Sequence, residues 1–258
     1  MPASAANSGA KRVAFVTGAS YGIGAATALA LARDGFDVAV SATRIENLAD
    51  TMAKLKAGGT RAAPVGLDLC SHTSIEQAMT EIIRALGRVD VLVNNAGAVL
   101  SKAATEVTAA EWDTVMSTNL SGTFFMSQQM GRHLIDSRRP GCIISITSTH
   151  GIVGAAARST YGISKAAIIH MSKMLAIEWA EHGIRVNTIA PGRLNTPSPA
   201  RAASAADPKY MQAKLNRIPL HRLCTAEEVA AAVSYLSSRH AEYITGQTLV
   251  LDGGLTAY

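Results

Sequence analysis

The sequence has no long apolar run. Nowhere in its 258 residues does a hydrophobic stretch approach the roughly 18 residues that a membrane-spanning helix needs. Residues 1–12 are small and polar and contain no apolar core of a signal peptide. We therefore expect no membrane partner and a cytoplasmic protein, in which residues 1–10 form a flexible N-terminal tail.

Cysteine is also scarce, with Cys70, Cys142 and Cys224 lying far apart. Their odd number and wide spacing predict neither a disulfide framework nor a zinc site, and we expect no metal. A reducing cytosol is the simplest setting for such a chain. The net charge of +5 is small and unclustered, so it argues against a nucleic-acid partner and suits an anionic cofactor or substrate.

Hydrophobic residues make up 48% of the chain, and they alternate between strand-like and helix-like patterns. No linker or repeat interrupts the alternation, which is typical of a parallel sheet covered by helices. We predict an α/β fold, a three-layer doubly wound (Rossmann) domain spanning 11–258 with a seven-stranded parallel sheet. The strands are expected at 11–17, 36–42, 61–69, 89–93, 141–148, 184–189 and 247–251. Helices are expected at 25–34, 46–57, 72–87, 108–136, 159–181 and 225–238.

A glycine-rich turn, Gly18-Ala-Ser-Tyr-Gly-Ile-Gly24, separates the first expected strand from the first helix. Gly18 allows a tight turn, Gly22 allows the backbone to approach a phosphate, and Gly24 allows the helix to pack against the strand. The free N–H groups at the helix start would bind a pyrophosphate. The pattern alone also fits an ordinary tight turn, but its place between strand and helix favours a dinucleotide site.

The end of the second expected strand reads Ser41-Ala42-Thr43-Arg44 and has no acidic residue to grip the ribose of NAD. Arg44 could instead pair with the 2′-phosphate of NADP, or it could be a solvated residue at a helix start. NADP is favoured, and the nearby Glu46 keeps NAD open. Asp68 and Leu69 end the third strand, where they could bind adenine, although Asp68 could equally cap the next helix.

Tyr161 and Lys165 are four residues apart on the helix expected at 159–181, so both lie on one face. A nearby ammonium favours the phenolate and so lowers the tyrosine pKa towards the range of a general acid or base. The pair also occurs by accident on ordinary amphipathic helices. Ser148 follows the fifth strand at the ligand-binding rim of the sheet. Asn119 lies inside the helix expected at 108–136, where it either bends the helix or faces water.

Together these motifs, with Asn94-Asn95-Ala96-Gly97 and Pro191-Gly192-Arg193-Leu194-Asn195-Thr196, resemble the short-chain dehydrogenase/reductase family over residues 11–254. The pattern is similar to that of its 3-oxoacyl-(acyl-carrier-protein) reductases. The resemblance implies a catalytic tetrad of Asn119, Ser148, Tyr161 and Lys165. Tyr161 would transfer the proton, Ser148 would bind the substrate oxygen, Lys165 would bind the nicotinamide ribose, and Asn119 would hold a relay water. It also implies that cofactor-binding residues are Gly18, Ser20, Tyr21, Gly22, Ile23, Gly24, Thr43, Arg44, Asp68, Leu69, Asn95, Ala96, Gly97, Tyr161, Lys165, Pro191, Gly192, Leu194 and Thr196.

The implied activity is a carbonyl reductase that transfers hydride between NADP(H) and a ketone or secondary alcohol, with a 3-oxoacyl thioester as one candidate substrate. The alternatives are an NAD(H)-dependent sugar-acid or polyol dehydrogenase and a dinucleotide-binding regulator without turnover. Residues 193–217, with three prolines and no clear period, are predicted to form a substrate lid. Its basic residues, with Arg132, His133, Arg138 and Arg139, would suit a small anionic substrate or an acidic carrier of acyl groups, or they could form an ordinary solvated surface. The resemblance further implies a homotetramer, and His150 is a candidate for the pocket mouth.

Overall fold

The computed structural model describes residues 11–194 and 208–257. Its centre is one sheet of seven parallel strands in the order β3-β2-β1-β4-β5-β6-β7, so the predicted fold class is confirmed. The strands are β1 (Val13–Val16), β2 (Asp37–Ala42), β3 (Ala62–Gly66), β4 (Val91–Asn94), β5 (Gly141–Ile146), β6 (Ile184–Pro191) and β7 (Thr248–Leu251). The tail expected at 1–10 lies outside the described residues.

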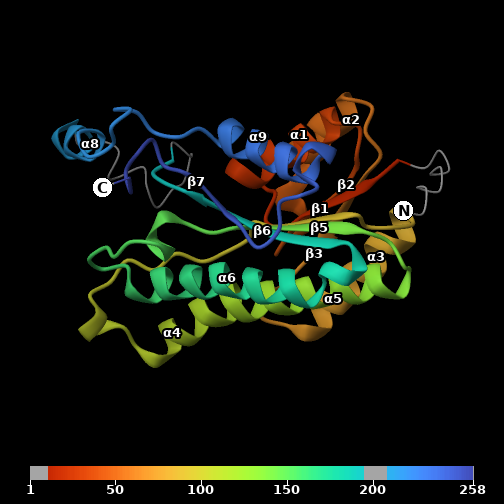
Figure 1. Cartoon of the computed structure of the whole chain (residues 1–258), viewed down its shortest axis with the longest axis horizontal. Helices are drawn as coiled ribbons and strands as arrows, with labels where there is room; N and C mark the ends of the chain where they lie inside the picture. Colours follow the sequence, from red (N-terminus) through yellow and green to blue (C-terminus); the bar gives the residue numbers. More distant parts are fainter. Residues whose placement is uncertain (1–10, 195–207, 258) are drawn as a thin grey trace.

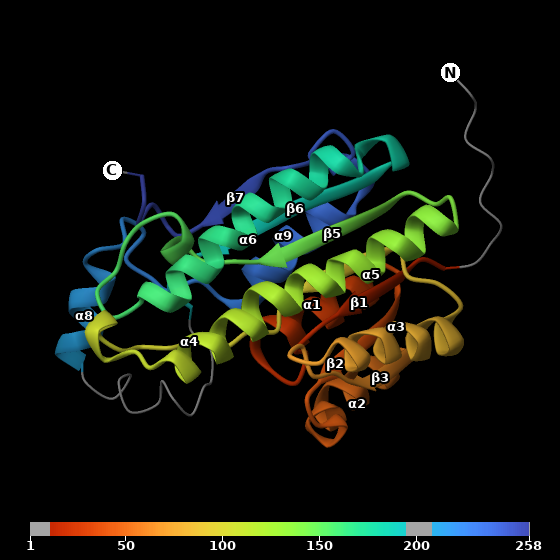
Figure 2. The same ribbon diagram turned by 90° about the horizontal axis from the view of Figure 1, so that it is seen from below.

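Helices cover both faces of the sheet (Figure 1). One layer holds α1 (Gly22–Arg33), α2 (Ala49–Ala57) and α9 (Ala226–Ser237). The opposite layer holds α3 (His72–Leu86), α4 (Ala109–Met116), α5 (Gly122–Asp136) and α6 (Ser159–Glu178), and Figure 2 looks onto it. Within the described ranges, no helix is both long enough and apolar enough to cross a membrane.

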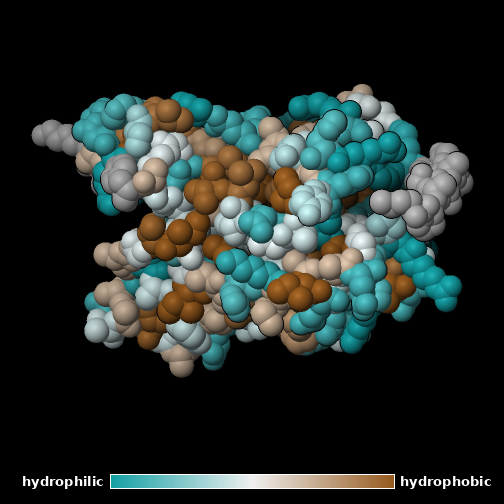
Figure 3. Space-filling model, in the orientation of Figure 1, coloured by the Kyte–Doolittle hydropathy of each residue, from teal (hydrophilic) through white to brown (hydrophobic). Residues whose placement is uncertain are grey.

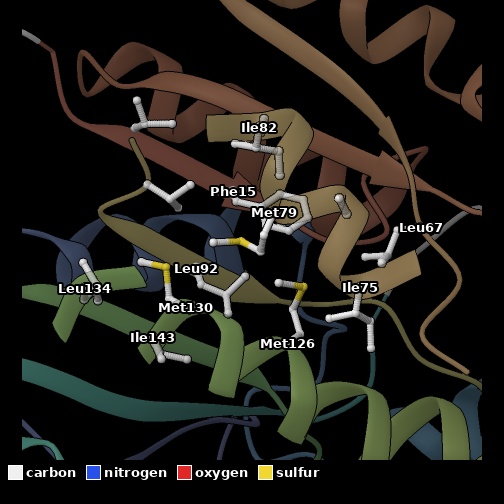
Figure 4. Packing of buried hydrophobic residues seen from close by; sticks show 14 of the residues in the cluster. Phe15, Leu67, Ile75, Met79, Ile82, Leu92, Met126, Met130, Leu134 and Ile143 are labelled. Atoms are coloured by element: carbon white, nitrogen blue, oxygen red, sulfur yellow. The ribbon is translucent and has the colours of Figure 1, made fainter. Parts of the chain in front are cut away.

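Alternation along the strands explains why both layers bury apolar surface. Phe15, Leu92 and Ile143 project to the α3 and α5 side, where they meet Met79 and Met126 (Figure 4). Their chain neighbours on the same strands project to the other side and pack against α1 and α9. Strands buried on both faces read as continuous hydrophobic runs, which is the pattern of the sequence.

The strand order reverses direction between β1 and β4. The chain first winds outward from β1 through β2 to β3, and then returns to place β4 on the other side of β1. In open parallel sheets, ligands bind beyond the carboxyl ends of the strands at this kind of reversal. The fold therefore points to the loops that follow β1, β4 and β5.

Two predicted regions differ from the structure in the kind of element they contain. The helix expected at 108–136 is divided into α4 and α5 by a π-helical turn, Ser117–Ser121. The region 193–217, whose sequence has no clear period, contains α8 (Pro208–Leu215), a short helix that begins at a proline. Residues 195–207 lie outside the described residues, so the lid stays a prediction.

Candidate active site

A cleft of about 850 Å³ follows the carboxyl ends of the strands. The space-filling view shows the surface hollowed at this end of the molecule, below α8 (Figure 3). Most of the predicted site residues line it: Gly18, Ser20, Tyr21, Gly22, Ile23, Thr43, Asp68, Leu69, Asn95, Ala96, Gly97, Ser148, Tyr161, Lys165, Pro191, Gly192 and Leu194. Gly24, Arg44 and Asn119 are not among the lining residues, and Thr196 lies outside the described residues.

The glycine turn has the backbone that its sequence requires. Gly18 and Gly22 have φ values of 64° and 60°, in the left-handed region that favours glycine. A Cβ atom at Gly24 would lie 2.3 Å from the Gly18 carbonyl oxygen, so only glycine fits there. Helix α1 begins without a side-chain cap and without an acidic residue in its first turn. No side-chain cap therefore accepts from the first N–H groups of α1, which could donate to a pyrophosphate.

Asn95 holds this turn in place with its side chain. Its Nδ2 donates to the carbonyl oxygens of Thr17 and Gly18, at 2.9 and 2.8 Å. Thr17 Oγ1 in turn accepts from the backbone nitrogens of Asn95 and Ala96, at 3.0 and 3.1 Å. The amide of Asn95 thus joins the β1 and β4 loops, and its neighbours Ala96 and Gly97 present backbone to the cleft.

Asp68 does not cap α3, so that alternative is wrong: the N-cap is Ser71, whose Oγ accepts from Ser74 N at 3.2 Å. Asp68 is exposed and its Oδ1 accepts from Cys70 N at 2.9 Å. Strand β3 ends at Gly66, three residues before its predicted end, which leaves Asp68 and Leu69 in the loop at the cleft.

At the end of β2 the structure separates two neighbours. Thr43 lines the cleft, whereas Arg44 is exposed and begins the 3-10 turn Ile45–Leu48. Asn47, which the sequence reasoning missed, also lines the cleft because that turn brings it back to the strand end. A tight turn directly after the second strand was the only signal that could have indicated it.

Lys165 is only 5% exposed and lies at the floor of the cleft. Its Nζ donates to the Ile146 carbonyl oxygen at 2.9 Å and lies 5.7 Å from the centre of the Tyr161 ring. Burial lowers the pKa of Lys165 from 10.5 to about 8, because desolvation penalises the charged form. Tyr161 and Lys165 therefore lie close together, and the lysine is less basic than in water.

Asn119 is fully buried in the π-helical turn, so the alternative that it faces water is wrong. Its Oδ1 accepts from Ala98 N at 2.7 Å, and its Nδ2 donates to Ala98 O at 2.9 Å and to Ser164 Oγ at 3.0 Å. Ser164 Oγ donates to the Tyr161 carbonyl oxygen at 2.7 Å. Ser164, missed by the sequence reasoning, thus connects the Asn119 turn to the helix of Tyr161.

Ser148 and His150 also line the cleft. Ser148 is buried, and its Oγ accepts from His150 N at 3.2 Å. The rings of His150 and Tyr161 lie edge to face with centres 6.1 Å apart. Burial, followed by the charges of Arg158 and Arg193, lowers the pKa of His150, which favours its neutral form.

One part of the basic region expected to act with the lid lies elsewhere. Arg132, His133, Arg138 and Arg139 are at the end of α5, just before β5 begins at Gly141. His133 Nε2 accepts from Val89 N at 3.2 Å, next to the start of β4. This is the amino edge of the sheet, opposite the cleft, so these four residues do not share an anion with it.

Comparisons with known proteins agree with this geometry. A family profile described as enoyl-(acyl carrier protein) reductase matches residues 18–256. The chain is 38% identical over 249 residues to a short-chain dehydrogenase/reductase of Armillaria gallica, covering 95% of each protein. It is 35% identical over 244 residues to the 3-oxoacyl-(acyl-carrier-protein) reductase of Thermotoga maritima, covering 95% of this chain and 97% of that protein.

A solved structure extends the likeness to three dimensions. The crystal structure of a variant of actinorhodin polyketide ketoreductase with NADPH matches with a TM-score of 0.91 and 33% identity, covering 96% of this chain and 98% of that one. The chain therefore belongs to the short-chain dehydrogenase/reductase family. It is an oxidoreductase of a family that acts on alcohols and ketones with nicotinamide dinucleotides.

Proposed function

We propose that the protein transfers hydride between NADP(H) and a ketone or secondary alcohol, with Asn119, Ser148, Tyr161 and Lys165 as its catalytic residues. The observation that carries the proposal is the meeting of Tyr161, Ser148 and buried Lys165 in one cleft, which also contains the dinucleotide turn. The uncapped start of α1 and the glycine backbone fit the phosphates of a dinucleotide.

In this mechanism the nicotinamide, when bound, supplies the hydride for reduction or accepts it in oxidation. Tyr161 donates its phenolic proton to the substrate oxygen during reduction and removes the proton from the hydroxyl during oxidation. Ser148 Oγ binds the same oxygen and orients it. The ammonium of Lys165 stabilises the phenolate, since the charge lies within the same buried space. Asn119 fixes the turn around Ala98 and so the wall beside Lys165.

Replacing Tyr161 with Phe tests the proposal. We expect Tyr161→Phe to reduce kcat by about 1,000-fold or more, because the phenolic proton is lost, while the Kd of NADPH stays within about twofold. Tyr235→Phe, on the exposed face of α9, is the matched control and should keep full activity. Turnover by Tyr161→Phe at the wild-type rate would refute the proposed role.

The preference for NADP(H) rests on the strand end Ala42-Thr43-Arg44, which carries no carboxylate to bind a ribose hydroxyl. Thr43 and Asn47 line this end of the cleft. Arg44, which is exposed, is the N-cap residue of the adjoining turn. Titration of NADPH and NADH, followed by cofactor fluorescence, should give a lower Kd for NADPH. Arg44→Gln should remove most of that difference, whereas Arg84→Gln, an exposed arginine on α3, should leave it unchanged.

For the substrate, the likeness to a 3-oxoacyl-(acyl-carrier-protein) reductase makes 3-oxoacyl thioesters the first compounds to assay. Equal or tighter binding of NADH would instead move an NAD(H)-dependent sugar-acid or polyol dehydrogenase to the front. Binding of cofactor without hydride transfer to a broad panel of ketones and alcohols would favour a dinucleotide-binding regulator.

We also propose a homotetramer. An apolar groove of about 400 Å³ runs between α5 and α6, and Met174 and Ile177 are exposed beside it. Leu249 and Val250 are exposed on β7, the edge strand. Exposed apolar surface of this kind is commonly an interface. Sedimentation should give a tetramer, and Ile177→Lys should reduce it to a smaller species; a wild-type monomer would contradict the proposal.

A further inference from the structure

The cleft has an uneven distribution of charge. Apart from Lys165, its described lysine and arginine lining residues are Arg158, Arg193 and Lys214, and all three lie at the end formed by the loops after β5 and β6 and by α8. The acidic residue among the described lining residues is Asp68, which follows β3. β3 is four strand positions from β5, which corresponds to about 20 Å across the sheet, so Asp68 and the three cations follow well-separated strands.

Arg158 directly precedes the helix that carries Tyr161. It is the N-cap residue of α6, and its carbonyl oxygen accepts from Gly162 N at 2.7 Å, which fixes its backbone in the turn that carries Tyr161. The preceding residue, Ala157, has a φ of 57° and is held by a hydrogen bond of 3.0 Å from Lys102 N. A left-handed conformation at a residue other than glycine is strained and persists only when its surroundings hold it.

The side chain of Arg158 is half-buried, and none of the Asp and Glu carboxylates described by the structure forms an ion pair with it. A partly desolvated guanidinium gains most from a planar anion that can accept two hydrogen bonds, such as a carboxylate or a phosphate. Arg158, Arg193 and His150 line the same cleft, and the ring of His150 lies edge to face with that of Tyr161.

The phosphates of a dinucleotide would lie elsewhere. Their predicted site is the start of α1, after β1, and β1 is two strand positions from β5, which corresponds to about 10 Å. Arg158 and Tyr161 follow β5 and line the part of the cleft that α8 borders with Met211 and Lys214. An anion at Arg158 therefore belongs to the substrate.

We propose that the substrate carries a carboxylate or phosphate group, and that Arg158 binds this group while Tyr161 and Ser148 hold the reacting oxygen. The inference rests on the proposed hydride transfer and adds a substrate class to it. Arg158 acts as a specificity residue in this proposal, with Arg193 and Lys214 increasing the local concentration of anions.

Matched acids and esters test the proposal. The compounds are 2-oxobutanoate, acetoacetate and 4-oxopentanoate, which differ in the distance from carbonyl to carboxylate, each beside its methyl ester. Dihydroxyacetone phosphate beside dihydroxyacetone forms the phosphate arm. Oxidation of NADPH is followed with the wild type, Arg158→Gln, Arg158→Lys and the control Arg84→Gln, which removes the same charge from the exposed surface of α3.

We expect the wild type to favour at least one anion over its uncharged partner by tenfold or more in kcat/KM, mainly through KM. Arg158→Gln should remove that preference without changing kcat/KM for the uncharged partner more than about twofold. Arg158→Lys should retain part of the preference for the anion, and Arg84→Gln should retain all of that preference. Preference among the carboxylates or for the phosphate then identifies which anion is bound.

Three outcomes overturn the inference. The first is equal kcat/KM for acids and esters in the wild type, and the second is an equal decrease of kcat/KM for acids and esters in Arg158→Gln. The third is a decrease of NADPH affinity in that variant as large as its decrease of kcat/KM. A wild type that reduces neither these compounds nor a 3-oxoacyl thioester contradicts the proposed function instead. Calorimetric titration of the same acids into the protein with NADPH then tests whether Arg158 binds the anion. Binding by the wild type that disappears in Arg158→Gln supports the inference. Binding that is unchanged in the variant, or absent from the wild type, refutes the inference.

Discussion

The two edges of the sheet contain similar residue types but use them differently. At the amino edge, Asp90 Oδ2 accepts from Val13 N at 2.8 Å and Oδ1 accepts from Arg88 Nε at 2.9 Å. The charged pair therefore connects the first residue of β1 to the residues just before β4. At the carboxyl edge, Lys165 is buried without a carboxylate among the described residues and faces a cleft. The partnered charges at the amino edge stabilise the fold, whereas the buried ammonium at the carboxyl edge lowers stability and, in the proposed function, serves catalysis.

The largest effect should come from removing the cation at the carboxyl edge. Lys165→Met should lower kcat by about 1,000-fold, equivalent to about 4 kcal/mol, because the phenolate of Tyr161 loses its stabilising charge. Steady-state assays at pH 7 measure the change. Lys173→Met, an exposed lysine on the same helix, is the control and should be fully active.

The same variant should change how stability depends on pH. The pKa of Lys165 is lowered from 10.5 to about 8 in the folded state, so the unfolded chain binds more protons between these values and stability rises with pH. Relative to Lys165→Met, the wild type should gain about 2 kcal/mol between pH 7 and 9.5, measured by urea unfolding. A constant difference across this range would show that the lysine is not desolvated.

The next largest effect concerns the amino edge. Asp90→Ala should lower the free energy of unfolding by about 3 kcal/mol, because it leaves Val13 N and the Arg88 guanidinium without their acceptor. The kcat of the folded enzyme should be unchanged. Asp50→Ala removes an exposed carboxylate that pairs with Lys54, and should cost less than about 0.5 kcal/mol. An Asp90→Ala variant that is stable but inactive would contradict the division between the two edges.

The smallest expected effect is a pH dependence at His133. Burial, followed by the charge of Arg139, lowers the pKa of His133, and its Nε2 accepts from Val89 N. The folded state therefore binds fewer protons, so stability is complete above the unfolded pKa of about 6.5 and falls below it. His133→Gln should reduce the loss between pH 7 and 5 by roughly 1 kcal/mol or less. His182→Gln, on an exposed turn, should leave the pH profile of the wild type.

Much of the fold could be predicted because its signals are local. Apolar strand runs and helical periods predicted the seven strands, and the glycine spacing predicted the turn whose φ values the structure has. The spacing of Tyr161 and Lys165 places both on one face of a helix wherever that helix lies. Boundaries were less certain: β3 is shorter than predicted because nothing in the sequence of Leu67–Leu69 says where pairing with β2 stops.

The sequence by itself determined the alternation of elements, the glycine turn and the helical pair, since each depends on residues a few positions apart. Only the tertiary structure decided that Asn119 reaches Ala98 and Ser164, that Arg158, Arg193 and His150 line one cleft, and that the basic end of α5 lies at the opposite edge from the cleft. These relations join residues from different elements. They depend on the order of the strands in the sheet and on which side chains the packing brings into contact. No single stretch of the chain determines the strand order or these contacts.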